Sequence, residues 1–383
     1  MLHLQETTKQ IIMTTFVIAL CALVLGYLIY GSFVERVFGA DPKRKTPCYT
    51  HQDGVDYIPM PTWKVYLIQF LNIAGTGPIF GAIMGILFGP AAYLWIVLGC
   101  IFGGAVHDYF SGMISIRKAG MSLPEIVGDE LGGGVRQVMR AFSLVLMILV
   151  GTVFVTTPAG LLASMTPTWG FWGSTTFWSV VIFIYYILAT LLPIDALIGR
   201  IYPVFGGALL IMAVGVLYGL FTHDNWMPEI GDAFTNHHPN ANLPIFPMLF
   251  ITIACGAVSG FHATQSPMMA RCIKNEKLGR RVFYGAMITE GIVAMIWAAA
   301  AIKYAGGYGQ LQALLNSEGN SNPALIVNFI CNDWMGTVGA VLAILGVVAA
   351  PVTSGDTAFR CARLIASDFL KFRQDTLWRR LVI

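Results

Sequence analysis

Apolar residues dominate this chain in runs that are each long enough to cross a bilayer. A membrane-spanning helix needs about 20 mostly apolar residues, and polar residues collect in the connections between such runs. We therefore predict an all-α polytopic membrane protein with nine transmembrane helices. The predicted spans cover residues 11–31, 65–89, 91–116, 138–162, 172–193, 200–221, 244–269, 281–302 and 335–359.

Two of these spans are interrupted in the middle by residues that break a helix. The first contains the glycine- and proline-bearing stretch 72–78, and the second contains the stretch 256–267. Glycine and proline weaken the helical ladder and free backbone groups that cannot be left bare in lipid. Such groups are tolerated where they face a ligand, an ion or a water-filled cavity. A pair of interrupted spans in matching positions of two halves is typical of a secondary transporter.

Composition supports a membrane protein and excludes most soluble classes. Of the 383 residues 56% are hydrophobic and only 11% are charged, and the mean hydropathy is +0.69, whereas about a quarter of the residues of a soluble protein are charged. The first apolar run lacks a small-residue cleavage site, so we expect a retained helix rather than a signal peptide. The seven cysteines show no metal-ligand spacing, and we expect neither disulfides nor a metal. The expected partners are the lipid bilayer and a small molecule, with no nucleic acid.

Basic residues fall almost entirely on one side of the predicted spans. Of the 23 Lys and Arg residues, 21 lie in alternate connections and in the tail, and Lys9 and Lys303 lie on the other side. Positive residues stay cytoplasmic, so we expect the amino terminus outside the cell. The outer link 222–242 has no clear metal-ligand spacing, so a solvated loop is favoured there over a metal site. Its titratable residues are His223, Asp224, Asp232, His237 and His238.

The two interrupted spans run in opposite directions in this topology. Each is followed by a long helix, a link with a short helical stretch, and another helix. The short stretches follow Ser122 and Asn322, each with an early proline. This arrangement predicts a five-plus-five inverted repeat, and residues 375–383 read like the start of another span, so either the natural protein continues or this chain is shortened. The expected parts are an extra N-terminal transmembrane helix (1–36), a cytoplasmic link (37–64), the first repeat (65–221), an extracellular loop (222–243) and an incomplete second repeat (244–383).

Two carboxylates lie deep within predicted spans. Asp108 and Glu290 are each nine residues from an arginine at the cytoplasmic end of the helix, which is roughly 13 Å at 1.5 Å per residue. A charged carboxylate is costly at that depth, which suits a group that takes and releases a proton in each cycle. The alternative is a structural role, with hydrogen bonds to the amides of a broken helix or pairing with His107.

A third carboxylate, Asp356, lies at the inner end of the ninth predicted span. The neighbouring Thr353 and Ser354 offer hydroxyl oxygens for a sodium ion, together with carbonyls freed in the first interrupted span. Hydroxyls in membrane helices more often bond to their own helix, so sodium is the less favoured interpretation. For Asp356 we favour pairing with Arg360, one turn away.

The side chains at the two interruptions are the candidate substrate ligands. His262 lies within the second interruption among several other polar residues, which favours contact with a ligand or a proton over simple packing. Amides at the amino end of a half-helix favour an anion such as a substrate carboxylate. The candidate substrate-binding residues are Asn72, Gly75, Thr76, Gly77, Ser259, Gly260, His262, Thr264 and Gln265. The candidate coupling residues are His107, Asp108, Glu290, Thr353, Ser354 and Asp356.

Several motifs resemble the carbon starvation A (CstA) family of bacterial membrane proteins, in order over about residues 65–370. They are Asn-Ile-Ala-Gly-Thr-Gly-Pro at 72–78, Gly-Gly-Ala-Val-His-Asp at 103–108, Ser-Ile-Arg-Lys-Ala-Gly at 115–120, Ser-Leu-Pro-Glu at 122–125, Ser-Gly-Phe-His-Ala at 259–263, Tyr-Gly-Ala-Met at 284–287 with Glu290, and Asp-Thr-Ala-Phe-Arg at 356–360.

The resemblance implies an inner-membrane transporter of peptides or pyruvate during nutrient limitation, driven by protons and with a leucine-transporter-like fold. This chain is shorter than the family pattern. It also has His107 where that pattern has Gln, so we expect a difference in substrate or proton coupling.

Together these features predict an alternating-access symporter for a small nutrient that bears a carboxylate. No cofactor is expected other than H⁺ or Na⁺ as the coupling ion. A sodium-coupled amino-acid-type symporter is the alternative, and a channel or a membrane-embedded enzyme is the rival of a different class. We do not predict an enzyme, because no nucleophile motif or metal pair accompanies His107 and Asp108.

Overall fold

The computed structural model describes residues 13–191, 198–317, 322–346, 350–370 and 378. Its regular structure is entirely helical across these residues. Six of the described helices are long and apolar enough to cross a membrane, or seven spans if one bent pair counts as a span. A multi-pass helical membrane protein is thereby confirmed. The six are Thr14–Phe38, Ala91–Arg117, Gly133–Gly160, Tyr202–Thr222, Glu276–Ala305 and Pro323–Ala343, and the bent pair is Thr62–Ile73 with Thr76–Phe88.

The helices follow one another with short connections. In the first half they are α2 (Thr14–Leu25), η1 (Gly26–Tyr30), α3 (Gly31–Phe38), α4 (Pro47–Thr50), α5 (Thr62–Ile73), α6 (Thr76–Gly85), η2 (Ile86–Phe88), α7 (Ala91–Leu98), η3 (Gly99–Gly104), α8 (Ala105–Arg117), α9 (Leu123–Leu131), α10 (Gly133–Met165), η4 (Pro167–Gly173), α11 (Thr175–Leu191) and α12 (Ile198–Thr222). In the second half they are η5 (Ile230–Asp232), η6 (Ile245–Leu249), α13 (Phe250–Thr252), α14 (Ala254–Ala257), α15 (His262–Ala270), η7 (Glu276–Leu278), η8 (Arg280–Tyr284), α16 (Gly285–Ala305), α17 (Tyr308–Leu315), α18 (Pro323–Ile344) and α19 (Ala350–Leu370).

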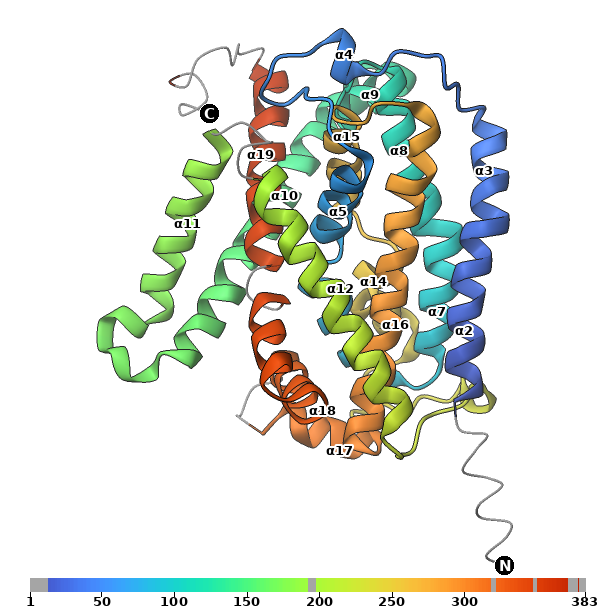
Figure 1. Ribbon diagram of the computed structural model, residues 1–383, viewed down its shortest axis with the longest axis vertical. Helices are drawn as coiled ribbons and strands as arrows, with labels where there is room; N and C mark the ends of the chain where they lie inside the picture. Colours follow the sequence, from blue (N-terminus) through green and yellow to red (C-terminus); the bar gives the residue numbers. More distant parts are fainter. Residues whose placement is uncertain (1–12, 192–197, 318–321, 347–349, 371–377, 379–383) are drawn as a thin grey trace, which may run out of the picture.

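Most of the long helices run side by side along the long axis of the molecule, and α11 lies at one edge, where it packs against α10 and α19 (Figure 1). The buried helix α16 packs against α2, both halves of the first broken segment, α7, α8 and α12. Four consecutive alanines at 298–301 are fully buried there. Small residues let neighbouring helix backbones approach closely, so α16 is the packing centre of the bundle.

The first interruption lies where the sequence predicts it. Helix α5 ends at Ile73 and α6 begins at Thr76, and the two halves meet at a bend of 45°. Helix α6 then packs tightly on the second broken segment. A Cβ atom added to Gly81 would lie 2.5 Å from the Thr252 carbonyl oxygen, and one added to Gly85 would lie 2.2 Å from Ile253. Glycine at these positions therefore lets the two broken segments touch.

The second interruption is also present, but it is narrower than predicted. Helix α14 ends at Ala257, Val258 is extended (φ −150°, ψ 111°), and α15 begins at His262. Pro267 lies within α15 rather than in the break. Within the predicted stretch 256–267 the unwound residues are therefore 258–261. The same segment also departs from helical geometry earlier, at Ile253 (φ −100°, ψ 33°) between α13 and α14.

The count of nine spans is not confirmed by the described residues. The fifth predicted span, 172–193, runs beyond Leu191 into residues that are not described. The ninth, 335–359, corresponds to the end of α18, which is broken at Gly336 (φ 60°), and the start of α19. Helix α19 carries several buried charged and polar residues, so composition alone does not mark it as a span. The count stays a prediction.

The two short link helices are present. Helix α9 follows Ser122, and α18 follows Asn322, each with proline in the first turn. The Asn322 side chain caps its helix by accepting a hydrogen bond from the amide of Ala324 (3.1 Å), whereas the Ser122 side chain makes no such cap. Helix α18 also continues beyond the predicted stretch, as far as the kink at Gly336.

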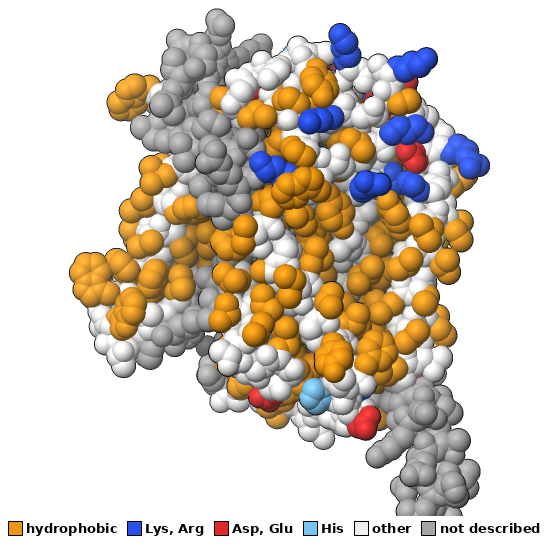
Figure 2. Space-filling model, viewed as in Figure 1, with side chains coloured by type: hydrophobic (Ala, Val, Ile, Leu, Met, Phe, Trp, Pro, Cys, Tyr) orange, Lys and Arg blue, Asp and Glu red, His pale blue; other side chains and the backbone are white. Residues whose placement is uncertain are grey.

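Basic side chains gather at one end of the molecule, around α4 and α9, with a few acidic side chains among them, whereas only acidic and histidine side chains appear as coloured charges at the opposite end of the face in view (Figures 1 and 2). The uncharged, largely apolar surface between them has the character of a membrane-facing belt. The sequence-based separation of charge is therefore visible in three dimensions. The orientation of the molecule in the cell stays a prediction.

Candidate functional site

Three titratable side chains from three separate helices meet inside the bundle. His262 is the first residue of α15, so the end of the unwound stretch fixes the position of its imidazole ring. Its Nδ1 lies 3.1 Å from Asp108 Oδ2 on α8, and its Nε2 lies 3.3 Å from Glu290 Oε2 on α16. The exposed fractions are 1% for His262 and 0% for both carboxylates. The imidazole therefore bridges two fully buried carboxylates.

A fourth group extends this cluster toward the protein surface. His107 Nδ1 lies 3.1 Å from Asp108 Oδ1, and the His107 side chain is 36% exposed. The two oxygens of Asp108 thus each lie near a different histidine. These contacts form a continuous series from a partly exposed imidazole to a buried carboxylate, in the order His107, Asp108, His262 and Glu290.

The charges of these four contacting side chains suit proton exchange. Charged groups inside a membrane are costly unless they are paired, and one imidazolium cannot neutralise two carboxylates. The angles at both His262 contacts fall outside hydrogen-bond geometry, so these are ion-pair distances without aligned hydrogen bonds. Gain or loss of one proton changes the charge of the whole cluster. The residues predicted as separate coupling and substrate groups are brought together here.

The first interruption presents an amide without a protein partner. The side chain of Asn72 is 1% exposed, and neither its nitrogen nor its oxygen bonds to any residue that the structure describes. Buried amides almost always have a hydrogen-bond partner, so this amide is suited to a ligand or a water molecule. Nearby Thr76 is also buried, at 5%.

The glycines of the first interruption let other segments pack closely, because they have no side chain. A Cβ atom on Gly77 would lie 2.7 Å from both Cβ and Sγ of Cys255, and one on Gly75 would lie 3.2 Å from Ser354 Oγ. Ser354 Oγ also donates a hydrogen bond to the Asn72 carbonyl (3.2 Å). The predicted proximity of Ser354 to a carbonyl freed by the break is therefore observed.

Asp356 has a hydrogen-bond partner that was not expected. Its Oδ2 accepts a hydrogen bond from the Tyr202 hydroxyl (2.8 Å), which also contacts the Thr353 carbonyl (2.6 Å). Arg360 forms an ion pair with Asp56 (3.2 Å), and its positive charge also acts on Asp356. Sequence proximity favoured the pairing within one helix turn, but packing of α12 against α19 places a tyrosine hydroxyl on the carboxylate.

The remaining predicted substrate ligands do not share the His262 cluster. Thr264 Oγ1 donates to the carbonyl of Phe261, the residue just before α15 (2.8 Å), and Gln265 Nε2 contacts Cys361 Sγ (3.7 Å) on α19. Ser259 and Gly260 remain in the unwound stretch, where a Cβ on Gly260 would meet only Leu146, at 3.9 Å. The predicted set is therefore divided between the two breaks and the interface with α19.

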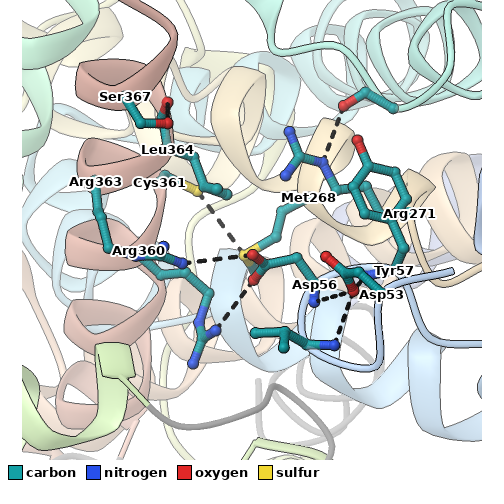
Figure 3. A network of polar contacts seen from close by, with 12 residues as sticks. Asp53, Asp56, Tyr57, Met268, Arg271, Arg360, Cys361, Arg363, Leu364 and Ser367 are labelled. Atoms are coloured by element: carbon teal, nitrogen blue, oxygen red, sulfur yellow. Dashed lines mark hydrogen bonds and ion pairs between the residues drawn. The ribbon is translucent and has the colours of Figure 1, made fainter. Parts of the chain in front are cut away.

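A second polar network joins the link before α5 to α15 and α19 (Figure 3). Asp56 Oδ1 lies 3.2 Å from Arg360 Nη1, and Asp56 Oδ2 lies 3.5 Å from Arg363 Nη2. The two arginines are 0% and 4% exposed. Arg360 also donates to the carbonyl of Ala189 (2.8 Å). Asp56 therefore connects the segment before the first broken span to α19.

A tight turn fixes the position of Asp56. Asp53 Oδ1 accepts hydrogen bonds from the backbone amides of residues 55–57, at 2.8 to 2.9 Å. The guanidinium of Arg271, after α15, lies 5.0 Å from the centre of the Tyr57 ring and donates through Nε to the Gly120 carbonyl (2.9 Å). Sequence analysis missed this network. The sequence feature that could have indicated it is the pair of arginines in α19, because buried arginines need an acidic partner.

The charge of Asp56 is stabilised by its neighbours. Burial alone would raise the pKa of this carboxyl, but the positive charges of Arg363, Arg360 and Arg271 lower it more. The net result is a pKa below the usual range of an aspartate. The carboxylate is therefore ionised, and the network holds, throughout the physiological range of pH.

Histidines of the outer link form aromatic contacts. His237 stacks on Tyr308 with ring centres 4.7 Å apart, and His223 stacks on Trp334 at 5.1 Å. Within the described ranges, no group of three or more His, Cys, Asp or Glu side chains could hold a metal ion. All seven cysteines have free thiols.

Comparison with known families agrees with the motifs. The sequence matches the profile of the family described as carbon starvation protein CstA over residues 11–177 and 163–338. The chain belongs to the CstA family. The family predicted from the motifs is therefore confirmed.

Relatives of this CstA family member include proteins described as transporters. A Haemophilus influenzae protein described as an uncharacterized membrane protein is 46% identical over 348 residues, covering 79% of this chain and 93% of that protein. The peptide transporter CstA of Campylobacter jejuni is 31% identical, covering 82% of this chain and 52% of that protein. The pyruvate/proton symporter BtsT of Escherichia coli is 28% identical, covering 72% and 47%. The chain therefore spans about half the length of these two transporters.

Proposed function

We propose that this CstA family member is a secondary transporter that takes up a small carboxylate-bearing nutrient, a peptide or pyruvate, together with protons. The observation that carries the proposal is the position of His262, the first residue after a helix break, between two fully buried carboxylates. A helix break places freed backbone groups at a ligand site, and buried ionisable groups in a membrane mark proton or ion pathways. Here both features share one residue. The descriptions of the two relatives as peptide transporter and pyruvate/proton symporter support the same class.

The substrate lies between the two breaks in this proposal. The unpartnered side-chain amide of Asn72 hydrogen-bonds the substrate, and the backbone amides of Thr76 and Gly77 at the start of α6 face its carboxylate. At the other break, residues 259–262 line the same space. Protons pass along His107, Asp108, His262 and Glu290, in the order in which these groups lie in contact.

Alternating access requires a barrier that closes on one side at a time. We assign the inner barrier to Asp56 with Arg360 and Arg363, because this contact pins the segment before α5 to α19. The broken segments then belong to two repeats of opposite orientation, with the amino terminus outside the inner membrane. The domain limits expected from the sequence stay part of the proposal.

Sodium coupling is the second candidate, and one contact favours it. Ser354 Oγ lies 3.2 Å from the Asn72 carbonyl, and Thr353 and Ser354 are both buried. A hydroxyl and a freed backbone carbonyl are ligands of the type that a sodium ion takes. In this version Asp356 supplies negative charge nearby.

Uptake into proteoliposomes separates these candidates. Labelled pyruvate and labelled dipeptides are offered under a proton gradient alone and under a sodium gradient alone. We expect accumulation with the proton gradient and its collapse with a protonophore. A channel lets solute equilibrate but does not accumulate a neutral solute, so passive equilibration without accumulation would contradict the proposal.

Three variants test the coupling cluster. We expect Asp108→Asn, His262→Gln and Glu290→Gln each to abolish accumulation while substrate exchange without a gradient continues, because each variant replaces a titratable group with a polar amide that neither takes nor releases a proton. Asp129→Asn is the matched control, since Asp129 forms exposed ion pairs with Arg136 and Lys118 and should accumulate normally. Normal accumulation by Asp108→Asn would remove that residue from the coupling role.

A further inference from the structure

A long groove lies on the outer surface of the bundle, between α2, η1, α5 and α16, away from the two helix breaks. Its volume is about 420 Å³. One end is formed by the first turn of α5 and by η8, and the other end by α16. The lining residues are Val24, Tyr27, Thr62, Trp63, Tyr66, Arg281, Gly285, Ile288, Thr289 and Ile292.

The length of the groove matches one leaflet of a bilayer. Arg281 and Ile292 both line it and are eleven residues apart on one helical segment, which is roughly 16 Å at 1.5 Å per residue. The hydrocarbon core of a bilayer is about 30 Å thick, so one acyl chain spans about half of that. Trp63 is 60% exposed at the α5 end of the groove, as expected for an aromatic residue at the headgroup level.

The deep part of the groove suits hydrocarbon. Its polar side chains are already satisfied, because the hydroxyls of Tyr66 and Thr289 are 2.6 Å apart and Thr289 also donates to the Gly285 carbonyl (2.9 Å). Ile288 and Ile292 line the same wall. An acyl chain therefore meets no polar atom that lacks a partner in this part of the lining.

The shallow end of the groove carries positive charge without a matching carboxylate. Arg281 is exposed and has no acidic side chain within ion-pair distance among the described residues. Its neighbour Arg280 differs, since it pairs with Glu35 (3.1 Å) and lies 5.2 Å from the Tyr27 ring centre. The amino-terminal turn of α5, which carries a positive partial charge, forms the same end of the groove.

We propose that this groove is a binding site for an anionic phospholipid of the leaflet at the basic face. Its phosphate pairs with Arg281 beside the start of α5, and one acyl chain lies along α16 between α2 and α5. Basic pockets between transmembrane helices on the cytoplasmic side recognise anionic headgroups in this way. The inference does not rest on the transport function proposed above.

Native mass spectrometry of the purified protein tests the site. The protein is equilibrated with equal amounts of phosphatidylglycerol and phosphatidylcholine that carry the same acyl chains. We expect the first bound lipid to be phosphatidylglycerol, with a preference of about fivefold, since each basic residue near the surface contributes on the order of 1 kcal/mol. Equal retention of the two lipids by the natural protein would overturn the proposal.

Three variants locate the site on the groove. Arg281→Ala should remove the preference and Arg281→Lys should keep most of it, whereas Arg36→Ala, which removes an exposed arginine from α3 outside the groove, should leave it unchanged. Val24→Trp should lower retention of both lipids, because it fills the groove and leaves Arg281 in place. An equal effect of Arg281→Ala and Arg36→Ala would show that the lipid preference comes from surface charge in general rather than from the groove, and would contradict the proposal.

Two further outcomes are decisive. If Arg281→Ala does not fold, Val24→Trp decides, and unchanged lipid retention in that variant refutes the groove. Inorganic phosphate at millimolar concentration should not displace the bound lipid, because the acyl chain contributes to binding. Complete displacement by phosphate would show that only a free anion is recognised, which would also refute a lipid site.

Discussion

Replacement of Asp56 by asparagine should open the inner side of the molecule. The variant removes the negative charge that lies 3.2 Å from Arg360 and 3.5 Å from Arg363. At an effective dielectric constant of 20, the closer charge pair alone is worth about 5 kcal/mol. Removal of one partner of a buried pair costs about 3–5 kcal/mol. Asn keeps the shape of the side chain, so we expect about 3 kcal/mol, which shifts the balance of closed and open states roughly a hundredfold.

Access to Cys361 reports this opening. Its thiol is buried next to the Thr264 carbonyl (3.5 Å) and lines a space of only about 20 Å³, which is too small for a bulky reagent. The assay uses protein in which the other six cysteines are alanine, reconstituted in liposomes and treated with a membrane-impermeant maleimide. We expect Asp56→Asn to be labelled at Cys361 roughly a hundredfold faster than the protein with Asp56, in line with the shift in the balance of closed and open states.

The control and the refuting result follow from the same geometry. Asp129→Asn removes a carboxylate from an exposed ion pair with Arg136 (2.7 Å), and such pairs contribute about 0–1 kcal/mol. It should therefore label at the unchanged rate. Equal labelling of Asp56→Asn and the parent, with both folded by circular dichroism, would show that Asp56 does not hold the inner barrier closed.

Two further predictions concern stability. Because the pKa of Asp56 is lowered in the folded protein, its contribution is fully present above the unfolded value of about 3.9 and is lost as pH falls through the lower folded value. The difference in melting temperature between the parent and Asp56→Asn should thus be constant from pH 8 to 5 and shrink below about pH 4; a difference that vanishes already at pH 6 would contradict this pairing. Gly77→Ala places a Cβ 2.7 Å from Cys255, so it should destabilise by about 1–3 kcal/mol, and Cys255→Gly should restore the melting temperature. Failure of that rescue would place the strain elsewhere.

The positions of the two helix breaks were predictable because their cause is local. The helical hydrogen-bond ladder is weakened by the glycines at 75 and 77 and by those around 256–260, whatever the tertiary surroundings of the helix. The breaks occur at 74–75 and 258–261. The partners of buried charges were not predictable in the same way. The sequence indicates that Asp108 and Glu290 each need a partner, but nothing local says that His262, more than 150 residues beyond Asp108, is the group between them.

Polar links were the weakest part of the sequence-based prediction. Asp56 lies in a stretch that reads as an ordinary cytoplasmic loop, and its role depends on two arginines about 300 residues further along. Proximity in sequence indicated Arg360 as a neighbour of Asp356, and its charge does act there. Packing adds the hydroxyl of Tyr202 as a hydrogen-bond donor to Asp356 and places the distant Asp56 in an ion pair with Arg360. Local spacing identifies which residues need a partner, and tertiary packing decides which partner each one has.

Substrate affinity and protonation should be linked through the backbone at residues 258–261. The imidazole of His262 is carried by the first residue after this unwound stretch, whereas Asp108 and Glu290 belong to continuous helices. A substrate that reshapes the stretch therefore changes the distances of 3.1 and 3.3 Å within the proposed coupling cluster, and coupling of this kind is reciprocal. We expect the dissociation constant for the transported nutrient to change with pH, by up to tenfold per pH unit, and this dependence to disappear in His262→Gln. Calorimetric titration from pH 5 to pH 8 measures the dissociation constant of the natural protein and of His262→Gln. An affinity that is independent of pH in the natural protein would show that substrate binding at the helix break is not coupled to protonation of the cluster.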